Sequence, residues 1–573
     1  MKKKGTVLIA LLLAVSILTG CGAAETALGS LFESSREDYA ARELCRFADM
    51  PYERPDTAAF TEKADAVLAA LEEGAGYRKV TGMLDELYAL YDSADTMFTI
   101  ADIRNCQDMT DEYYAAEYAA CRNATMSINR DMERVYLACG ASKHASRLAR
   151  EYFWDGFLDE YGPDAEETMT EEYMVLANRE SELIAQYRNL TANPGIEVNG
   201  RELPLYEALN SARDEEEYFS LYEAYYEKYN RLLGELYLEL VQVRKEQAAL
   251  LGFESYAEMA YAYSFDRDFT VAEGHDFAES VRKYIVPLYL RAADAELQME
   301  LAERYVPEEE LYDALEAVAD GLGGEVREAY DFMRRYELCD IAMSDLKPDM
   351  SFEAYLSDYA APFLFASPYG DLNDVITVTH EFGHYVDAYV SFNAYRSMDL
   401  AEVFSQALQY LSLPELGGVL GKSGVDDLRR LNLLDALDTY VQQVSFVEFE
   451  DRVFAMEEPT VEKLNALSLQ LAKDYGYYDG VSEDYYALSW IDIPHFFEQA
   501  FYVISYPVSL GTALEIYERE LNGSGDGLEA FRALLDCEQT GIVGAAAEAG
   551  LENPLSDARV REIAAFLEQQ LAA

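Results

Sequence analysis

The residues best suited to chemistry form the run His380-Glu381-Phe382-Gly383-His384. On a helix, positions i and i+4 lie one turn apart on the same face, so both imidazoles can reach one metal ion. Zinc binds neutral imidazoles, and a catalytic zinc site takes three protein ligands and leaves a position for water. Glu381 can then accept a proton from that water. The chain has only five histidines, which makes a chance pairing at this spacing improbable.

A third ligand is needed, and Glu402 is the candidate. It lies near the start of a second helical pattern and flanks its apolar stripe, which includes Val403 and Phe404. A lone carboxylate is costly to bury there unless a cation compensates it. The alternative is an ordinary acid at a helix N-terminus that interacts with the helix dipole. Spacing alone does not decide between the two.

The elements that must position these residues are helices. Asp371 and Asp374 offer capping carboxylates to a helix that carries the two histidines, and an apolar stripe follows from Val375 to Tyr389. Helical periodicity covers most of the chain before it, in stretches that begin and end near residues 58–73, 79–95, 110–138, 171–190 and 214–251. A short apolar run, Phe363–Ala366, is the one candidate strand near the site.

The pattern breaks between residues 190 and 205, where Asn199-Gly200 predicts a two-residue hairpin turn. We therefore predict an N-terminal helical domain over residues 36–195 and a catalytic domain over residues 196–573. The glycine-rich run Asn522–Gly527 predicts a loop, and since no strand precedes it, it is a very weak nucleotide-binding signal.

Three further polar side chains, those of His495, Tyr502 and Tyr506, are seven and eleven residues apart. If the segment is helical, they share one face. An imidazole and two phenols are donors that can hold a developing oxyanion. The alternative is an aromatic core helix with incidental polar tips, which is what aromatic residues at helical spacing usually form.

The motifs resemble those of the thimet oligopeptidase and oligoendopeptidase F family. The likeness rests on Thr379–Tyr385, on Ala401-Glu402-Val403 with its glutamate eighteen residues after His384, and on Ile493–Tyr506. It extends over Arg244–Phe253 and over Phe277–Pro287, and covers roughly residues 200–520. The N-terminal half resembles the family only in its helical character.

The resemblance implies a set of roles. Glu402 is expected to be the third ligand of one zinc ion, Glu381 the general base, and His495 with Tyr502 and Tyr506 the donors to the scissile carbonyl. The implied fold is mainly α, a two-lobed zincin-type metallopeptidase with a deep central channel and a small β element near the active site. Such a channel would admit short unstructured peptides and exclude folded proteins.

Two positions depart from the family pattern. Relatives often carry a second glutamate seven residues after the ligand glutamate, where this chain has Gln409. Ser367 stands where an asparagine is more usual, next to a strand that the resemblance implies is an edge strand pairing with the substrate backbone. Neither change removes a ligand or the base, but the first bears on metal affinity or rate.

Composition excludes several classes of partner. The chain has 45 basic and 107 acidic residues, and its net charge is −62. Such a field repels nucleic acid phosphates and anionic lipid head groups, so neither is an expected partner. An acidic surface that simply keeps the protein soluble is the plain interpretation.

The N-terminus predicts export. Lysines 2–4 precede the apolar run Val7–Leu18, and Leu18-Thr19-Gly20-Cys21 resembles the lipobox of bacterial lipoproteins. We expect residues 1–20 to be a signal peptide, Cys21 to carry the lipid, and residues 21–35 to be a tether. The protein would then be extracytoplasmic, held to the cell membrane through lipid alone. The six later cysteines permit disulfides, although free thiols are slightly favoured in a chain of this size.

These observations predict a zinc-dependent endopeptidase of short peptides. The alternative is a surface lipoprotein that binds peptides but has lost turnover, a possibility that the altered position Gln409 leaves open. An adhesin would predict repeats or a low-complexity stalk, and the sequence has neither. The oligomeric state is not predicted.

Overall fold

The structure is a computed structural model of the 573-residue chain, and it describes residues 42–572 except 155, 164, 166, 167, 169, 193, 294, 479–481 and 524. The expected signal peptide (1–20), the tether (21–35) and Cys21 lie outside the described residues.

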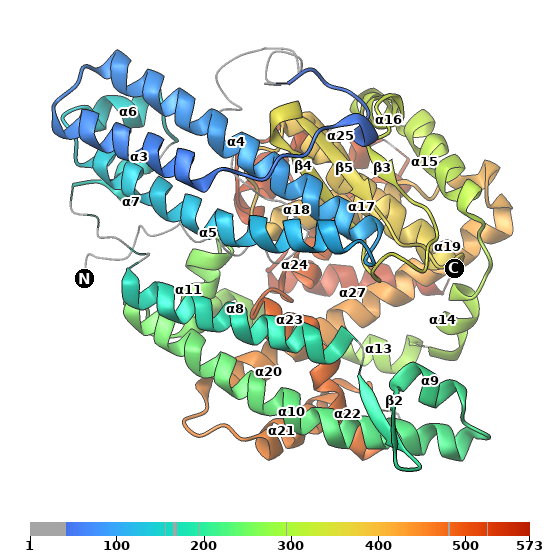
Figure 1. The fold of residues 1–573 in the computed structure, drawn as a ribbon. Coiled ribbons are helices and arrows are strands. Elements are labelled where there is room, and N and C mark those ends of the chain that lie inside the picture. The colour runs from blue at the N-terminus through green and yellow to red at the C-terminus, as the bar shows by residue number, and fades with distance from the viewer. Residues whose placement is uncertain are drawn as a thin grey trace.

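The N-terminal helices form a layer of their own (Figure 1). After a 3₁₀ turn, η2 (Phe47–Asp49), they are α3 (Thr57–Glu72), α4 (Tyr77–Gln107), α5 (Glu112–Gly140), α6 (Ala145–Glu151) and α7 (Phe157–Tyr161). Asp56 and Asp111 cap α3 and α5 by accepting hydrogen bonds from first-turn backbone N–H groups. Buried apolar residues of this layer, such as Phe60, Leu84 and Val135, form a separate small core.

The next segment adds two long helices and a hairpin. Its elements are α8 (Glu171–Ala192), β1 (Gly195–Val198), β2 (Arg201–Pro204), α9 (Leu205–Asn210) and α10 (Glu215–Leu250). As predicted, the hairpin turns at Asn199 and Gly200, whose φ angles are 53° and 78°. Two positive φ angles are what the tight turn between twisted antiparallel strands requires. Side chains of α8 and α10 share the large core of the molecule.

Shorter helices follow and lead to a small mixed sheet. They are α11 (Tyr256–Met259), the π-helical turn η3 (Ala260–Ser264), α12 (Val271–Tyr284), α13 (Val286–Ala292), α14 (Ala295–Ala302), α15 (Glu308–Leu322) and α16 (Gly324–Arg335). The sheet has the order β3-β5-β4, from β3 (Cys339–Asp340), β4 (Phe352–Leu356) and β5 (Ala361–Phe365), with the 3₁₀ turn η4 (Ser357–Tyr359) between β4 and β5.

The sheet corrects one expectation. The candidate strand is present as β5, but it lies in the middle of the sheet, parallel to β3 and antiparallel to β4. Its backbone groups are therefore already paired on both sides, and β4 is an edge strand instead. The run Phe352–Leu356 has no clear apolar alternation because both of its faces are buried, so the sequence pattern did not reveal it.

The remaining elements are helical and carry the site. They are α17 (Leu372–Ser391), α18 (Met398–Leu411), η5 (Glu415–Gly418), α19 (Gly421–Asp438), the π-helical turn η6 (Thr439–Gln443), α20 (Val444–Ala455), α21 (Val461–Tyr475), α22 (Glu483–Leu488), η7 (Ser489–Asp492), α23 (Pro494–Glu498), α24 (Ser505–Leu521), α25 (Asp526–Leu535), α26 (Ile542–Glu548) and α27 (Asp557–Leu571). α18 packs against both α17 and α24.

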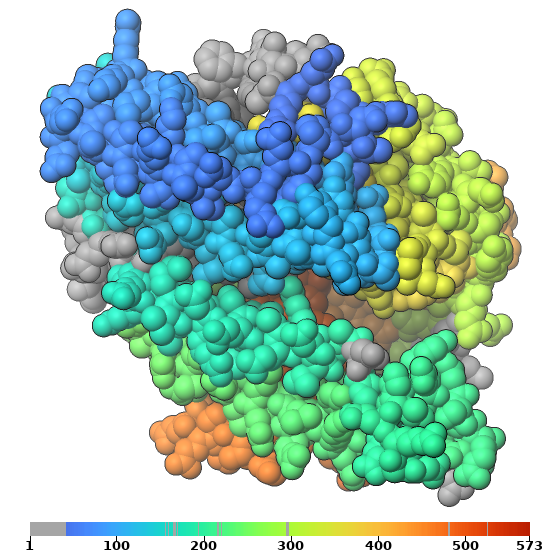
Figure 2. All heavy atoms as spheres, viewed as in Figure 1, coloured from blue at the N-terminus to red at the C-terminus, as the bar shows by residue number. Residues whose placement is uncertain are grey.

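The arrangement is mainly α and two-lobed, as expected. In Figure 1 the N-terminal layer, the sheet and α17 lie on one side, and α8, α10, α21 and α22 lie on the other. The space-filling view shows a hollow between α5 and α8, with atoms from the last part of the chain at its base (Figure 2). Among the described residues no helix is long and apolar enough to span a membrane. The six cysteines after Cys21 are unpaired, and Cys106, Cys121, Cys139 and Cys537 are buried.

Candidate metal centre

α17 positions the two histidines. Its N-terminus is a capping box, in which Asp371 accepts from the backbone N–H of Asn373 and Asp374 reaches back to the N–H of Asp371. The rings of His380 and His384 are one turn apart, with centroids separated by 5.1 Å. The predicted helix and its cap are therefore present.

Gly383 lets a second helix come close to α17. A Cβ at this position would lie 2.4 Å from the carbonyl oxygen of Phe404 and 2.5 Å from the Cα of Ser405, both on α18. Real Cβ atoms do not approach backbone this closely, so any side chain here would force the helices apart. The glycine between Glu381 and His384 is thus needed for packing.

α18 brings the third donor to the two rings. Ser397 caps this helix, and Glu402 follows within its first turns, 2% exposed. One oxygen of Glu402, Oε2, lies 3.4 Å from Nε2 of His380 and 3.9 Å from Nε2 of His384. These three residues form the group of metal-ligating side chains found among the described residues, with donor atoms within 4.8 Å of one another.

The donor set fits a zinc ion. Two imidazoles and one carboxylate are a common set of three ligands at catalytic zinc, and Zn–N bonds of about 2.0–2.1 Å place tetrahedral donor atoms about 3.4 Å apart. Within the described part of the chain, only the two histidines form ion pairs with Glu402. A buried carboxylate in such surroundings calls for a cation.

The three donors shift one another's pKa values. Burial opposes ionisation of Glu402, but the hydrogen bond and charge of His380 outweigh it and lower the carboxyl pKa to about 2. Burial also disfavours a charged His380, yet Glu402 raises its pKa to about 9. His384 shows the opposite result, because burial lowers its pKa to about 4. A cation bound here would take the place of a proton on His380.

Glu381 lies beside the donors with a free carboxylate oxygen. The side chain is buried, and its Oε2 has no hydrogen-bond partner among the described residues. Burial and the charge of Glu402 raise the pKa of Glu381, against the effect of His380, to about 7. A carboxylate with this pKa can both accept and return a proton near neutral pH.

Tyr502 and Tyr506 make different contacts. The Tyr502 hydroxyl donates to Oε1 of Glu402 at 2.7 Å, so it holds the carboxylate whose other oxygen faces the histidines. The Tyr506 hydroxyl lies 3.3 Å from Nε2 of His495. The ring of His495 stacks on Tyr502, with centroids 5.2 Å apart. Burial lowers the pKa of His495, which favours its neutral form.

The segment that joins these residues is not one continuous helix. α23 ends at Glu498, and α24 begins at Ser505. Between them Phe501 has a φ of 68°, and its backbone N–H donates to Oε1 of the buried Glu450 at 2.9 Å. The continuous helix that would place His495, Tyr502 and Tyr506 on one face is therefore absent from this segment, but the three rings still lie together.

Two buried arginines hold this region, and sequence reasoning had assigned them no role. Arg244 of α10 donates to the carbonyls of Phe496 and Phe497 at 2.8 and 2.5 Å and pairs with Glu180 of α8 at 2.7 Å. These carbonyls stand in the short helix α23, just after His495.

The second is Arg267, which pairs with Asp399 at the start of α18 at 3.2 Å and donates to Ser505 Oγ at 3.0 Å. It thereby joins the helix that carries Glu402 to the helix that carries Tyr506. Both side chains of the ion pair are fully buried. Neither arginine stands out by its neighbours in the sequence, because Lys245 and Glu246 follow Arg244 and Arg267 lies between two aspartates.

Gln409, the departure from the family pattern, lies next to the donors. Its side chain favours the charged form of the His380 imidazole and so contributes to the raised pKa of that group. Ligand histidines usually donate their second N–H to such a group. Ser367, the other departure, follows β5 and donates its backbone N–H toward Ser351 at 3.4 Å.

Comparison with protein families gives two matches along the chain. Residues 47–154 match the Peptidase M3 N-terminal domain, and residues 354–533 match Peptidase family M3. The second segment contains every residue of the candidate metal centre, together with His495, Tyr502 and Tyr506.

Curated relatives match over part of their length. The chain is 30% identical to Oligopeptidase PepF of Bacillus subtilis over 169 residues, which are 26% of this chain and 24% of that protein. It is 29% identical to the chromosomal Oligoendopeptidase F of Lactococcus lactis subsp. cremoris over 189 residues, 28% of this chain and 29% of that protein. The matched segments thus span about a quarter of these relatives.

Solved structures match over nearly the whole chain. The structure of PZ peptidase A with an inhibitor superposes with a TM-score of 0.77 at 21% identity, covering 92% of this chain and 99% of that one. Oligoendopeptidase F from Enterococcus faecium gives a TM-score of 0.57 at 18% identity, covering 90% and 96%. At these identities the likeness establishes the fold.

Proposed function

Because this chain belongs to peptidase family M3, the family of oligoendopeptidase F, we propose that it is a zinc-dependent endopeptidase of short, unstructured peptides. The observation that carries the proposal is the convergence of His380, His384 and Glu402, with the carboxylate of Glu381 beside them. The hollow between the lobes supports a preference for extended chains over folded proteins (Figure 2).

The chain's own residues divide the reaction between them. His380, His384 and Glu402 would hold one zinc ion, which when bound polarises the peptide carbonyl and lowers the pKa of a water molecule. Glu381 takes a proton from the attacking water and returns it to the leaving amine. Its unpartnered oxygen beside the three donors suits both transfers.

Oxyanion stabilisation falls to His495 and Tyr506. The two groups lie 3.3 Å apart, and both can donate to a carbonyl oxygen on which negative charge develops. Tyr502 was expected to share this role, but its hydroxyl is already donated to Glu402. We therefore assign Tyr502 to positioning of the carboxylate and Tyr506 to the oxyanion.

The deciding experiment is the variant Glu381→Gln. We expect loss of hydrolysis of a quenched peptide by a factor of about 10³ or more, since the variant keeps the shape of the side chain but cannot accept a proton. Its zinc content, measured by elemental analysis, should equal that of the wild type. Appreciable residual turnover would refute the assignment of Glu381 as base.

The same measurements separate an enzyme from a peptide-binding protein without turnover. In the wild type, hydrolysis that a chelator abolishes and added zinc restores supports the enzyme. Peptide binding without any cleavage, at full zinc occupancy, would favour the binding protein instead.

We also propose that the protein is an exported lipoprotein anchored through Cys21. Support comes from the basic start, the apolar run and the lipobox-like Leu18–Cys21. Labelling with a radioactive fatty acid in a bacterial host should mark the wild type and not Cys21→Ser. Equal labelling of both would exclude this anchor.

A further inference from the structure

A second cavity lies beside the catalytic cluster and has no part in the reaction described above. Its volume is about 600 Å³, and it is bounded by α13, by the junction of α19 and α20, and by residues of the stretches 476–478 and 485–496. Two of its rim residues, Leu290 and Tyr485, are 64% and 46% exposed, so the cavity opens to solvent.

Its inner end is next to the proposed active site. Ile493 and Phe496, which line the cavity, flank His495 in sequence. On the opposite wall Asp438 lies one helical turn after Asp435, and Asp435 is close enough to His380 for their charges to interact. A peptide held at the metal centre can therefore place a neighbouring side chain in this cavity.

The lining combines aromatic rings with two carboxylates. The rings belong mainly to tyrosines, among them Tyr477 and Tyr486, together with Trp490. The carboxylates are those of Asp438 and Asp492. Among the described residues that line the cavity, none is a lysine, arginine or histidine.

Both carboxylates have only neutral partners. Gln442 donates to Asp438 at 3.4 Å, and Gln298 and Tyr289 also form hydrogen bonds with it. Asp492 accepts from the hydroxyls of two tyrosines, 225 and 226, at 3.2 and 2.6 Å. Among the described residues neither aspartate forms an ion pair, so the negative charge of the cavity is not compensated.

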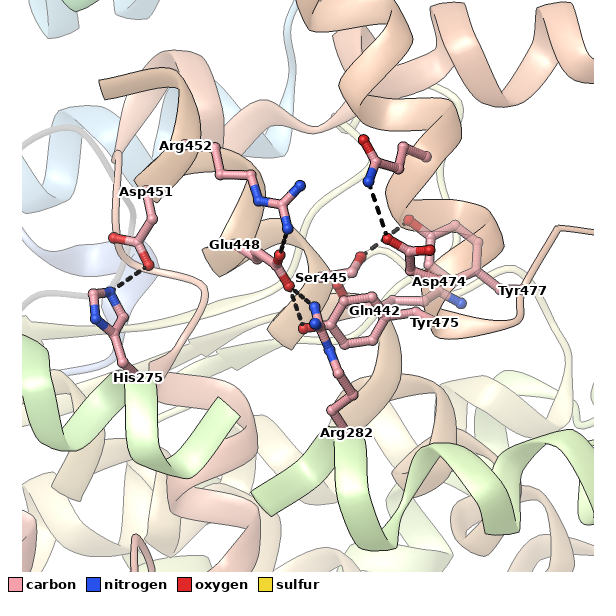
Figure 3. Close-up of polar contacts among 11 residues, drawn as sticks. His275, Arg282, Gln442, Ser445, Glu448, Asp451, Arg452, Asp474, Tyr475 and Tyr477 are labelled. Carbon is pink, nitrogen blue, oxygen red and sulfur yellow. Dashed lines mark hydrogen bonds and ion pairs between the residues drawn. The ribbon is translucent and has the colours of Figure 1, made fainter. Parts of the chain in front are cut away.

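The basic side chains nearby are engaged elsewhere. Figure 3 shows Arg282 and Arg452 both directed at Glu448, which also accepts from Tyr475 at 2.9 Å. In the same view Ser445 and Tyr477, which line the cavity, bond each other at 3.0 Å. Lys473 lies over the ring of Tyr478 at 5.0 Å but pairs with Glu483 outside the cavity.

We propose that this cavity is a specificity subsite that binds a cationic side chain of the peptide, arginine in preference to lysine, close to the bond that is cut. A planar guanidinium can stack on the tyrosine rings and donate two hydrogen bonds to Asp438. An ammonium group offers no flat face for stacking, and an acidic side chain would be repelled. The inference rests on the proposed peptidase function and specifies its substrate class.

The test compares peptides that differ at one position. A quenched peptide series carries arginine, citrulline, lysine or glutamate at each of three positions on either side of the cleaved bond. Citrulline has the shape of arginine without its charge. At one position we expect kcat/KM for arginine to exceed that for citrulline by about tenfold or more at low salt, with glutamate lowest.

Two matched variants test whether the cavity causes the preference for arginine. Asp438→Asn should reduce the arginine preference to near parity with citrulline, chiefly by lowering kcat/KM for the arginine peptide. Asp474→Asn makes the same charge change on α21, where Asp474 contacts Gln470 and does not line the cavity (Figure 3), and should keep the preference.

The outcomes separate this inference from the proposed function. Equal rates for arginine and citrulline at all positions, or a preference that survives in Asp438→Asn, would overturn the subsite while the enzyme stands. No cleavage of any peptide by zinc-loaded protein would instead overturn the peptidase itself, and the subsite with it.

Discussion

Glu402 links the histidines to Tyr502, because its two carboxylate oxygens face different partners. Oε2 faces the two imidazoles and also lies 3.3 Å from the hydroxyl of Ser405. Oε1 accepts a hydrogen bond from Tyr502. A ligand whose second oxygen is held in this way keeps its orientation when the metal is absent. Tyr502 and Tyr506 should therefore have different effects, the first on metal binding and the second on catalysis.

Removing the two hydroxyls one at a time tests this separation. Tyr502→Phe frees Oε1 of Glu402, and we expect zinc affinity to fall about 10- to 100-fold. Tyr506→Phe leaves the ligands untouched, so zinc affinity should be unchanged while kcat falls about 100-fold through loss of an oxyanion donor. Competition with a chromogenic chelator gives the affinity, and steady-state kinetics at saturating zinc gives kcat. Identical behaviour of the two variants would contradict the assignment.

At the scale of elements, the centre depends on how closely α17 and α18 approach. The histidines and Glu402 stand on different helices, and their separation of 3.4 Å exists only because Gly383 carries no side chain. Arg267 and Asp399 then fix the start of α18 against α24. Breaking a buried pair of this kind by removing one partner typically costs about 3–5 kcal/mol.

Gly383→Ala should separate the two helices. The added Cβ would meet backbone of α18, which cannot move as a flexible side chain can, so we expect a loss of roughly 2–3 kcal/mol in stability and a marked loss of zinc affinity. Gly417→Ala is the matched control, since a Cβ there meets nothing within 4 Å. Thermal denaturation and zinc titration of both proteins provide the comparison. A Gly383→Ala protein as stable as its control would show that the helices do not need this approach.

Much of this arrangement could be predicted from the sequence, and the failures have a physical cause. The pattern and cap at Asp371 predicted α17 because they are local signals. The sequence left open whether His495 to Tyr506 is one helix, and the segment is interrupted near a left-handed residue, Phe501, whose backbone N–H bonds to the distant Glu450. The contact between Tyr502 and Glu402 likewise joins residues 100 positions apart in sequence, and spacing carries no signal for it.

At the scale of the whole molecule, acidic side chains outnumber basic ones overall and also among the buried charged residues that the structure describes. The net charge is −62, and several carboxyl groups are buried without an ion pair among the described residues. Burial raises the pKa of Glu450 to about 8 and that of Asp92 to about 7, and it raises that of Glu353 well above its usual value. A raised pKa means that the folded protein binds more protons than the unfolded chain, so these groups make stability fall as pH rises.

We therefore expect a protein that is more stable at pH 5 than at pH 8. Glu450 contributes a loss of unfolding free energy on the order of 3 kcal/mol as the pH rises from its unfolded pKa of about 4.5 to its folded pKa of about 8. Glu450→Gln can still accept from Phe501 but cannot ionise, so the pH dependence should be smaller. Glu457→Gln, at an exposed position just beyond α20, is the control. Denaturant titrations give the free energy of unfolding at both pH values. If Glu450→Gln lost as much of this free energy between pH 5 and pH 8 as the wild type does, the assignment to Glu450 would be contradicted.

The contact of Arg244 with Glu180 has a consequence for dissecting the protein. Arg244 holds the turn that carries His495, yet its carboxylate partner stands on α8, upstream of the hairpin. A recombinant fragment starting at residue 196 would retain the guanidinium and discard its counter-ion, leaving a buried positive charge alone. Such a fragment should load zinc poorly or turn over slowly, whereas one starting at residue 171 should not share that defect. A truncated protein should therefore begin before α8, although the sequence pattern changes only after α8, between residues 190 and 205.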